Sequence, residues 1–303
     1  MKVLVLGGNG FIGSHIVDFF FAAGNEVAVL DIAYEKFREP LSGVKYYIGN
    51  YGDKSLIDVA LRGVDLVVHA ISSTIPVTSN ENPIYDVQSN LINTIALLHE
   101  CVNKSIKRII YLSSGGAVYG TVKSLPVNEE HVLFPQSSYG IVKLAVEKYL
   151  YLFNHLYGLE FNIIRPSNPY GARQNPYGTL GSLSVFLGKI SRKENIQILG
   201  DGSVARDYIY VSDLVKAIYS AAITEHTNQI YNIGSGKAYT LNQLLIKIRD
   251  VLKIDFNVQY MPSRPCDVPN IFLDCQLANK NLNWYVEIPL EEGILRTWDF
   301  IKK

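Results

Sequence analysis

The sequence predicts an α/β protein in which helices cover both faces of a doubly wound parallel sheet, beside a smaller mixed α/β lobe. Across the first two-thirds of the 303 residues, short and almost entirely apolar runs alternate with amphipathic stretches of helical length. Such runs are typical of parallel strands buried on both faces. Three glycines follow the first run directly. Beyond Arg165 the chain becomes rich in Pro, Gly and Asn, as loops are.

Each expected element follows from its local pattern. Apolar runs predict strands at 2–6, 26–30, 44–48, 65–69, 108–112 and 161–165. Longer amphipathic stretches predict helices at 11–23, 54–61, 84–103 and 139–157. After the loop-rich segment we expect strands at 197–199 and 229–232 and helices at 211–223 and 241–251. The chain therefore divides into a first domain, 1–165, and a second lobe, 166–303, some segments of which return to the first domain.

Composition and charge narrow the classes of function. Twenty-eight basic residues balance twenty-eight acidic ones, so we expect no broad basic surface for nucleic acid. Cys101, Cys266 and Cys275 are too few and too scattered for a disulfide framework. The apolar run 17–24 is far shorter than a membrane span, and no signal peptide is recognisable before the first strand. We expect a cytoplasmic protein with neither a membrane span nor a metal site.

The glycine pattern Gly7-x-x-Gly10-x-x-Gly13 lies between the first strand and the first helix. Glycines there let the backbone turn tightly and approach a pyrophosphate, which the helix N-terminus binds through its amides and dipole. Asp31 ends the next strand, 18 residues after Gly13, where it can accept hydrogen bonds from the adenosine ribose and repel a 2′-phosphate. The pattern predicts a Rossmann-type domain that binds NAD over NADP. A structural turn with a chance acid is the alternative.

Tyr139 and Lys143 lie four residues apart at the start of an expected helix, and so on one helix face. A free tyrosine has a pKa near 10 and is a poor base at neutral pH. A nearby lysine charge, together with a nicotinamide cation, should favour the phenolate and lower this pKa. The pair is therefore a candidate general acid–base. The alternative is an ordinary surface Tyr and Lys.

Several motifs together carry a family resemblance. They are G-G-N-G-F-I-G-S-H at 7–15, V-V-H-A at 67–70, S-S-G-G-A-V-Y-G at 113–120, Y-G-I-V-K at 139–143, R-P-S-N-P-Y-G at 165–171, G-D-G-S-V-A-R-D-Y-I-Y-V-S-D-L at 200–214 and R-P-C-D-V-P at 264–269. The chain resembles the extended short-chain dehydrogenase/reductases nearly from end to end. It is most similar to their UDP-glucose/UDP-galactose 4-epimerase group.

The resemblance implies a role for each matching residue. Tyr139 is the base for the sugar's 4-hydroxyl, and Lys143 holds the nicotinamide ribose and tunes Tyr139. Further cofactor-binding residues are implied at Phe11, Ile12, Asn50, Tyr51, Ala70, Asn90 and Ser113, in addition to the three glycines and Asp31. A nucleotide-diphosphate sugar, most often a UDP-hexose, would be bound by Asn168, Arg206, Arg264 and Asp267. For either arginine, a surface salt bridge is the alternative. Relatives pair the helices 84–103 and 139–157 across a two-fold axis, which implies a homodimer; packing within the monomer is the alternative.

The sequence departs from the family pattern at Gly115, where relatives carry a Ser or Thr that shares the proton of the sugar hydroxyl. We expect Ser114, or a water in the space beside Gly115, to take the orienting role. Ser114 bonded only to backbone is an equal alternative. Relatives also vary at the position of Ile271, which limits N-acetyl groups. With Gly115 adding room, we expect some tolerance of larger sugars. Asn50 replaces a frequent aspartate, and its amide oxygen could accept from the adenine amine.

The same segment limits the reaction. Hexose dehydratases and decarboxylases of this superfamily carry acidic residues where Gly116 and Ala117 stand, so elimination would lack its acid and base. Reversible hydride transfer at one carbon remains. This leaves an NAD-dependent nucleotide-sugar 4-epimerase, or a 4-keto-6-deoxy-sugar reductase using NAD(P)H; Asp31 favours the epimerase. A non-catalytic nucleotide-sugar sensor is the third alternative.

Overall fold

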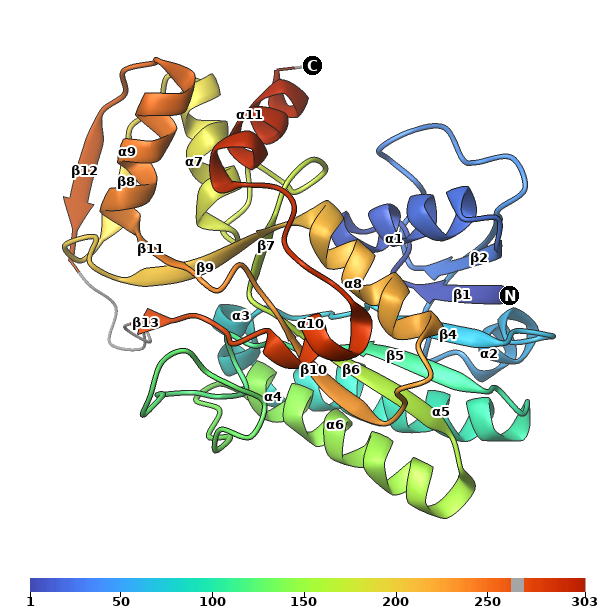
Figure 1. The fold of residues 1–303 in the computed structure, drawn as a ribbon. Helices are drawn as coiled ribbons and strands as arrows, with labels where there is room; N and C mark the ends of the chain where they lie inside the picture. Colours follow the sequence, from blue (N-terminus) through green and yellow to red (C-terminus); the bar gives the residue numbers. More distant parts are fainter. Residues whose placement is uncertain (263–269, 303) are drawn as a thin grey trace.

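Seven parallel strands form the central sheet of the computed structural model, which describes residues 1–262 and 270–302 (Figure 1). Their order is β10-β6-β5-β4-β1-β2-β3. The strands are β1 (Lys2–Leu6), β2 (Glu26–Asp31), β3 (Lys45–Ile48), β4 (Leu66–His69), β5 (Arg108–Leu112), β6 (Glu160–Pro166) and β10 (Gln229–Ile233). The order reverses between β1 and β4, and ligands of doubly wound sheets bind beyond the carboxyl ends of the strands at such a point.

Helices cover both faces of this sheet (Figure 1). On one face lie α1 (Phe11–Ala22) and α8 (Val211–Ile223), which share a core with Val3 and Val5. On the other face lie α2 (Lys54–Ala60), α5 (Asn93–Asn103) and α6 (Ser138–Tyr157), which share a core with Leu4 and Leu6. Successive residues of β1 thus point to opposite, equally apolar sides, and both faces must be covered.

The second lobe is built around a smaller mixed sheet. Its strands are β7 (Asn168–Tyr170), β9 (Ala205–Tyr210), β11 (Ala238–Thr240) and β13 (Asn270–Ile271). β11 runs antiparallel to β9, while β7 and β13 run parallel to it. A separate parallel pair joins β8 (Ile196–Leu199) and β12 (Val258–Met261). The helices α7 (Ser182–Ser191), α9 (Leu241–Leu252), α10 (Gln276–Leu282) and α11 (Leu290–Ile301) complete this part.

The predicted helix 84–103 is present but contains a wider turn. It consists of α4 (Pro83–Asp86), the π-helical segment η1 (Val87–Ile92) and α5, and it follows the short α3 (Pro76–Glu81). Two hydroxyls explain the irregularity: those of Tyr51 and Thr94 donate to the carbonyl oxygens of Ser89 and Asn90, each over 2.5 Å. These carbonyls are thereby drawn from the regular helical pattern. Such π-turns occur often at functional sites.

The predicted fold class is confirmed. The strand expected at 229–232 pairs with β6 and completes the main sheet, although it follows residue 166 in the chain. Across 1–262 and 270–302, no helix has the length and apolar character that crossing a membrane requires. The short strands β7, β11 and β13 were not predicted, because two or three residues carry too little pattern.

Candidate active site

The glycine turn lies at the carboxyl end of β1. Gly7 adopts a positive φ of 81°, and its N–H donates to the carbonyl of Leu30 over 2.8 Å. A Cβ at Gly13 would lie 1.9 Å from the carbonyl oxygen of Gly7, so only glycine permits this close contact between helix and turn. Gly10, the N-cap of α1, has no side chain to accept from the first amides of the helix. Those amides, which include Phe11 and Ile12, can therefore donate to a phosphate.

Asp31 lies at the end of β2, beside this turn. One carboxylate oxygen accepts from the N–H of Asn9 and the other from the N–H of Ala33, each over 3.0 Å. The carboxylate is therefore held in place, and each oxygen retains a lone pair for a ribose hydroxyl. Ala70 also borders the turn, because a Cβ at Gly7 would lie 3.3 Å from its carbonyl carbon.

Two predicted cofactor residues on the loop after β3 differ in orientation. Asn50 is exposed, and its amide oxygen accepts from the N–H of Gly52 over 2.8 Å, which leaves one lone pair for an adenine amine. The side chain of Tyr51 is buried, with its hydroxyl bonded to η1 and its ring packed against His69. The side chain of Tyr51 thus packs in the core, and a contact of this residue with the cofactor stays a prediction.

Asn90 and Ser113 are both buried beneath the site. The amide oxygen of Asn90 accepts from the N–H of Ser73 over 2.8 Å, and its nitrogen donates to Asp86 over 2.9 Å. The hydroxyl of Ser113 donates to Glu147 over 2.5 Å. The side chains of both residues thus fix neighbouring elements. The hydroxyl of Ser113 is turned toward α6, and a cofactor contact of this residue stays a prediction.

Tyr139 and Lys143 lie in the first turns of α6, close to the end of β5. The Nζ atom of Lys143 lies 5.6 Å from the ring centre of Tyr139 and 4.9 Å from that of Tyr111. It donates to the carbonyl of Leu112 over 2.7 Å, which fixes the lysine against β5. The hydroxyl of Ser137 caps the helix by accepting from the N–H of Gly140. The structure thus brings the predicted pair together.

Burial is the largest influence on the pKa values of both Tyr139 and Lys143. Burial raises the pKa of Tyr139 to about 12, although a hydrogen bond with Ser114 opposes this. Burial also lowers the pKa of Lys143 to about 8, against the attraction of Asp86 and Glu147. In the absence of NAD, desolvation of the phenol is thus the largest influence on the pKa of Tyr139, and its lowering by Lys143 together with a nicotinamide cation stays a prediction.

Ser114 and Gly115 resolve the question raised by the missing hydroxyl. Ser114 hydrogen-bonds Tyr139 through its side chain, as does Ser72 from the loop after β4. A Cβ at Gly115 would lie 2.7 Å from Cδ1 of Leu273, a residue of the second lobe. The expected space for a water or a larger sugar beside Gly115 is thus filled by a leucine. Of the two predicted alternatives, the geometry favours Ser114.

The predicted substrate residues lie on the second lobe. The side-chain nitrogen of Asn168 donates to the carbonyl of Asp207 over 2.9 Å, and a nitrogen of Arg206 donates to the carbonyl of Ala205, also over 2.9 Å. Ile271 pairs in register with Arg206 and is buried in a small apolar cluster with Leu273. Its influence on N-acetyl groups stays a prediction. Arg264 and Asp267 lie outside the described residues.

Sequence reasoning missed two buried groups. Arg165 and Glu147 are both fully buried and form a bidentate ion pair, with Nε to Oε1 at 3.0 Å and Nη2 to Oε2 at 2.5 Å. This pair joins β6 to α6 one turn beyond Lys143. Asp86, also fully buried, accepts three side-chain hydrogen bonds. The position of Glu147, four residues after Lys143 on the same helix face, was the available signal.

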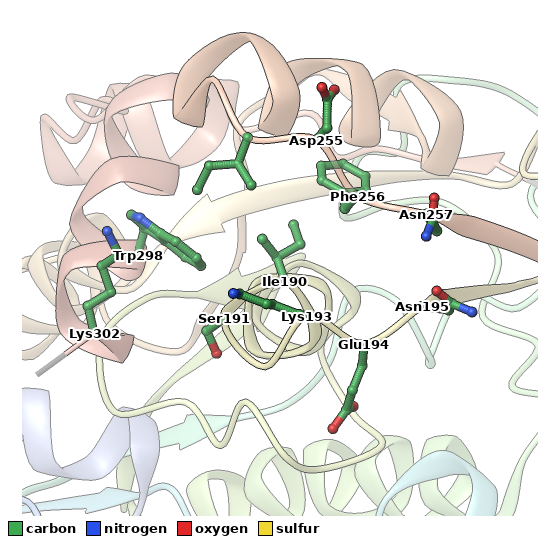
Figure 2. Close-up of a pocket in the computed structure, with 11 residues that line it drawn as sticks. Ile190, Ser191, Lys193, Glu194, Asn195, Asp255, Phe256, Asn257, Trp298 and Lys302 are labelled. Carbon is green, nitrogen blue, oxygen red and sulfur yellow. The ribbon is translucent and has the colours of Figure 1, made fainter.

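A separate cavity lies on the second lobe. It measures about 450 Å³, and its lining includes Ile190, Phe256 and Trp298 together with Lys193 and Lys302 (Figure 2). None of the predicted site residues that the structure describes lines it. The candidate active site is therefore assigned from the converging side chains around Tyr139.

Comparison with known proteins decides the family. The family model described as NAD dependent epimerase/dehydratase matches residues 3–234. The chain belongs to the NAD-dependent epimerase/dehydratase family. This confirms the resemblance read from the motifs, and it establishes NAD as the cofactor.

Relatives in this family match along their whole lengths. A Methanocaldococcus jannaschii protein provisionally named UDP-glucose 4-epimerase is 37% identical over 302 residues, covering 99% of this chain and 98% of the relative. An Escherichia coli dTDP-4-dehydro-6-deoxyglucose reductase is 31% identical over 301 residues, covering 96% and 95%. The crystal structure of a Thermotoga maritima UDP-glucose 4-epimerase with UDP-glucose superposes with a TM-score of 0.95, at 35% identity, covering 100% and 99%.

Proposed function

We propose that this member of the epimerase/dehydratase family is an NAD-dependent nucleotide-sugar 4-epimerase. The observation that carries the proposal is the Tyr139–Lys143 pair, held at the carboxyl end of β5, the same end of the parallel sheet at which the glycine turn follows β1. The residues of that turn fit NAD: the site admits no side chain at Gly13, its helix end has no side-chain cap, and Asp31 is fixed at its rim. Such a site can hold a dinucleotide next to an acid–base group.

In the proposed mechanism Tyr139 exchanges a proton with the 4-hydroxyl of the sugar. NAD, when bound, would supply a hydride acceptor for C4 of the sugar and a positive ring that favours the tyrosinate. Ser114 orients the phenol through their shared hydrogen bond, and the Lys143 charge adds to the stabilisation of the phenolate. Loss of the C4 hydride and the hydroxyl proton leaves a 4-keto sugar. Return of the hydride to the opposite face, with the proton from Tyr139, gives the epimer.

A UDP-hexose is the proposed substrate, because the relatives with the epimerase name act on or bind UDP-glucose. Asn168 and Arg206 lie on β7 and β9 of the second lobe, and we propose that they hold the diphosphate together with Arg264. Arginine suits this role because its planar fork binds phosphate oxygens in pairs. Asp267 is proposed for the nucleoside ribose. Tolerance of N-acetylated sugars remains a proposal that rests on the family resemblance alone.

One of the relatives, the E. coli reductase, has a different reaction, which is the alternative to epimerisation. A 4-keto-sugar reductase uses the same tyrosine and lysine but consumes reduced cofactor in every cycle. Asp31 favours the epimerase, because its fixed carboxylate would repel the 2′-phosphate of NADP, which such reductases often prefer.

We further propose a homodimer that works in the cytoplasm, in galactose metabolism or polysaccharide synthesis. The helices 83–103 and 138–157 lie side by side and carry exposed apolar side chains. Ile141, Leu152 and Leu156 share one face of α6, and Ile84 and Ile92 are exposed on the neighbouring helix. Such a surface suits a two-fold interface. Light scattering tests this: a monomer across the micromolar range would contradict it.

The deciding experiment incubates the purified protein with a panel of nucleotide sugars, without added cofactor, and follows the products by NMR. Interconversion of UDP-glucose and UDP-galactose is the expected result. Stoichiometric consumption of NADH or NADPH with a 4-keto-6-deoxy sugar, and none of the interconversion, would assign the reductase. Binding without any turnover would contradict both reactions and leave a sensor.

A further inference from the structure

Asp86 joins three segments of the active site. Its side chain is fully buried at the end of α4. One carboxylate oxygen accepts from the hydroxyl of Thr74 over 2.6 Å and from the amide of Asn90 over 2.9 Å. The other accepts from the hydroxyl of Ser138 over 2.7 Å. These partners belong to the loop after β4, to η1 and to the first residue of α6, and η1 packs against α6.

These bonds fix the position of the acid–base tyrosine. Ser138 directly precedes Tyr139, and the N–H groups of the two residues donate to side chains of α3: to Asn80 over 2.9 Å and to Ser79 over 3.0 Å. On the opposite side, Thr74 anchors the loop that carries Ser72, because the Ser72 hydroxyl donates to the Thr74 carbonyl over 3.0 Å. The tyrosine and one of its hydroxyl neighbours are thus held by the same carboxylate.

The charge of Asp86 acts on the same pair. Its three hydrogen-bond donors are neutral hydroxyl and amide groups. Glu147, the other anion near Lys143, is bonded twice to the Arg165 guanidinium, which compensates its charge. Among residues 1–262 and 270–302, Asp86 has no such cation as a hydrogen-bond partner, so its negative charge acts on the pair with little local compensation.

Asp86 raises the pKa of both Lys143 and Tyr139. Burial lowers the Lys143 pKa to about 8, and Asp86 is the largest influence that opposes this. Asp86 also raises the pKa of Tyr139. The remaining groups around Lys143 are Glu147, the rings of Tyr139 and Tyr111, and neutral His69.

We propose that Asp86 is the positioning residue of the Tyr139–Lys143 pair. Its hydrogen bonds hold the tyrosine in place, and its negative charge keeps the lysine protonated at working pH. The assignment rests on the proposed function for its catalytic consequence, whereas its effect on Lys143 is a property of the folded protein alone.

Asp86→Asn tests the proposal, because it removes the charge and keeps the size. Its amide oxygen can still accept from Thr74 and Asn90, and its amide nitrogen can donate to the Ser138 hydroxyl. Both limbs of the kcat–pH profile should move toward lower pH, each by about one unit, with KM changed less than about twofold. In protein labelled at the lysine Cε atoms, the titration midpoint of Lys143 should fall by a similar amount. Ser138→Ala is the matched control: it removes one bond to the same carboxylate and should lower kcat without moving either limb.

The outcomes separate this inference from the proposed function. The inference would be overturned if Asp86→Asn lowered kcat at every pH but left both limbs of the kcat–pH profile and the Lys143 titration unchanged. Shifts of the same size in Ser138→Ala would also overturn it. If no nucleotide sugar is turned over but the Lys143 midpoint still falls, the proposed reaction is wrong and the positioning role stands. Should Asp86→Asn fail to fold by circular dichroism, Asp86→Ser also removes the charge, and its Lys143 titration decides.

Discussion

His69 is held as a neutral ring at the end of β4, and this makes the stability of the fold depend on pH. The side chain is 1% exposed. Its Nδ1 accepts from the N–H of Ile71 over 3.3 Å, and its Nε2 lies 2.9 Å from the hydroxyl oxygen of Thr94. Because Thr94 donates its own hydrogen to the Asn90 carbonyl, Nε2 must be the donor to Thr94. A second proton would break the bond to Ile71 and bury a charge near Lys143.

The size of this pH-dependent change in stability follows from the pKa of His69. Burial lowers the pKa of His69 from 6.5 to about 3, with the Lys143 charge adding to the shift. Each pKa unit corresponds to about 1.4 kcal/mol, so the full gap is worth about 5 kcal/mol. Below pH 6.5 the His69 ring of the unfolded chain binds a proton, whereas the same ring in the native protein stays neutral. The contribution of neutral His69 is therefore complete above that pH and is lost as the pH falls toward 3.

Urea unfolding at about pH 6.5 and about pH 4.5 measures this loss in the wild type and in His69→Gln. The variant keeps a donor and an acceptor but has no titrating ring, and other acidic groups affect both proteins alike. The wild type should lose about 2 kcal/mol more than the variant over this interval. Equal losses in the two proteins would refute the reasoning.

Three further substitutions test separate parts of the site. Gly13→Ala should weaken NADH binding at least about tenfold, because its Cβ would lie 1.9 Å from a carbonyl oxygen of the glycine turn; unchanged affinity by fluorescence titration would argue against that turn as the cofactor site. Ser114→Ala should lower kcat about tenfold with little change in KM, because it removes a hydrogen bond to Tyr139; an unaltered kcat rejects the role. Glu147→Gln should lower the free energy of unfolding by about 3–5 kcal/mol, because buried Arg165 loses its counter-ion; a loss within error in urea would contradict this.

The parts of the site that follow from local patterns could be predicted from the sequence. The glycine turn needs only its spacing after an apolar run, and Asp31 only its place at the end of the next strand. Tyr139 and Lys143 are paired by one helical turn. Each of these relations extends over a few residues of chain, and the fold class follows from the alternation of such patterns.

Relations between distant segments could not be predicted in this way. The bond between Ser138 and Asp86 spans 52 residues, and nothing local marks Asp86 as buried. Leu273, which fills the space beside Gly115, comes from the second lobe. The burial of Tyr139 is a relation of the same kind: the sequence showed the lysine one turn away but not the desolvation that raises the pKa of the phenol.

Interconversion of UDP-glucose and UDP-galactose by Tyr139→Phe, compared with the wild type, tests the central claim most directly. The variant lacks only the phenolic hydroxyl, and NADH fluorescence verifies that its cofactor site is intact. We expect turnover by the wild type and a loss of at least about a thousandfold in the variant, since the phenol is the group that moves the proton in the proposed mechanism. Turnover by Tyr139→Phe at the wild-type rate would contradict it.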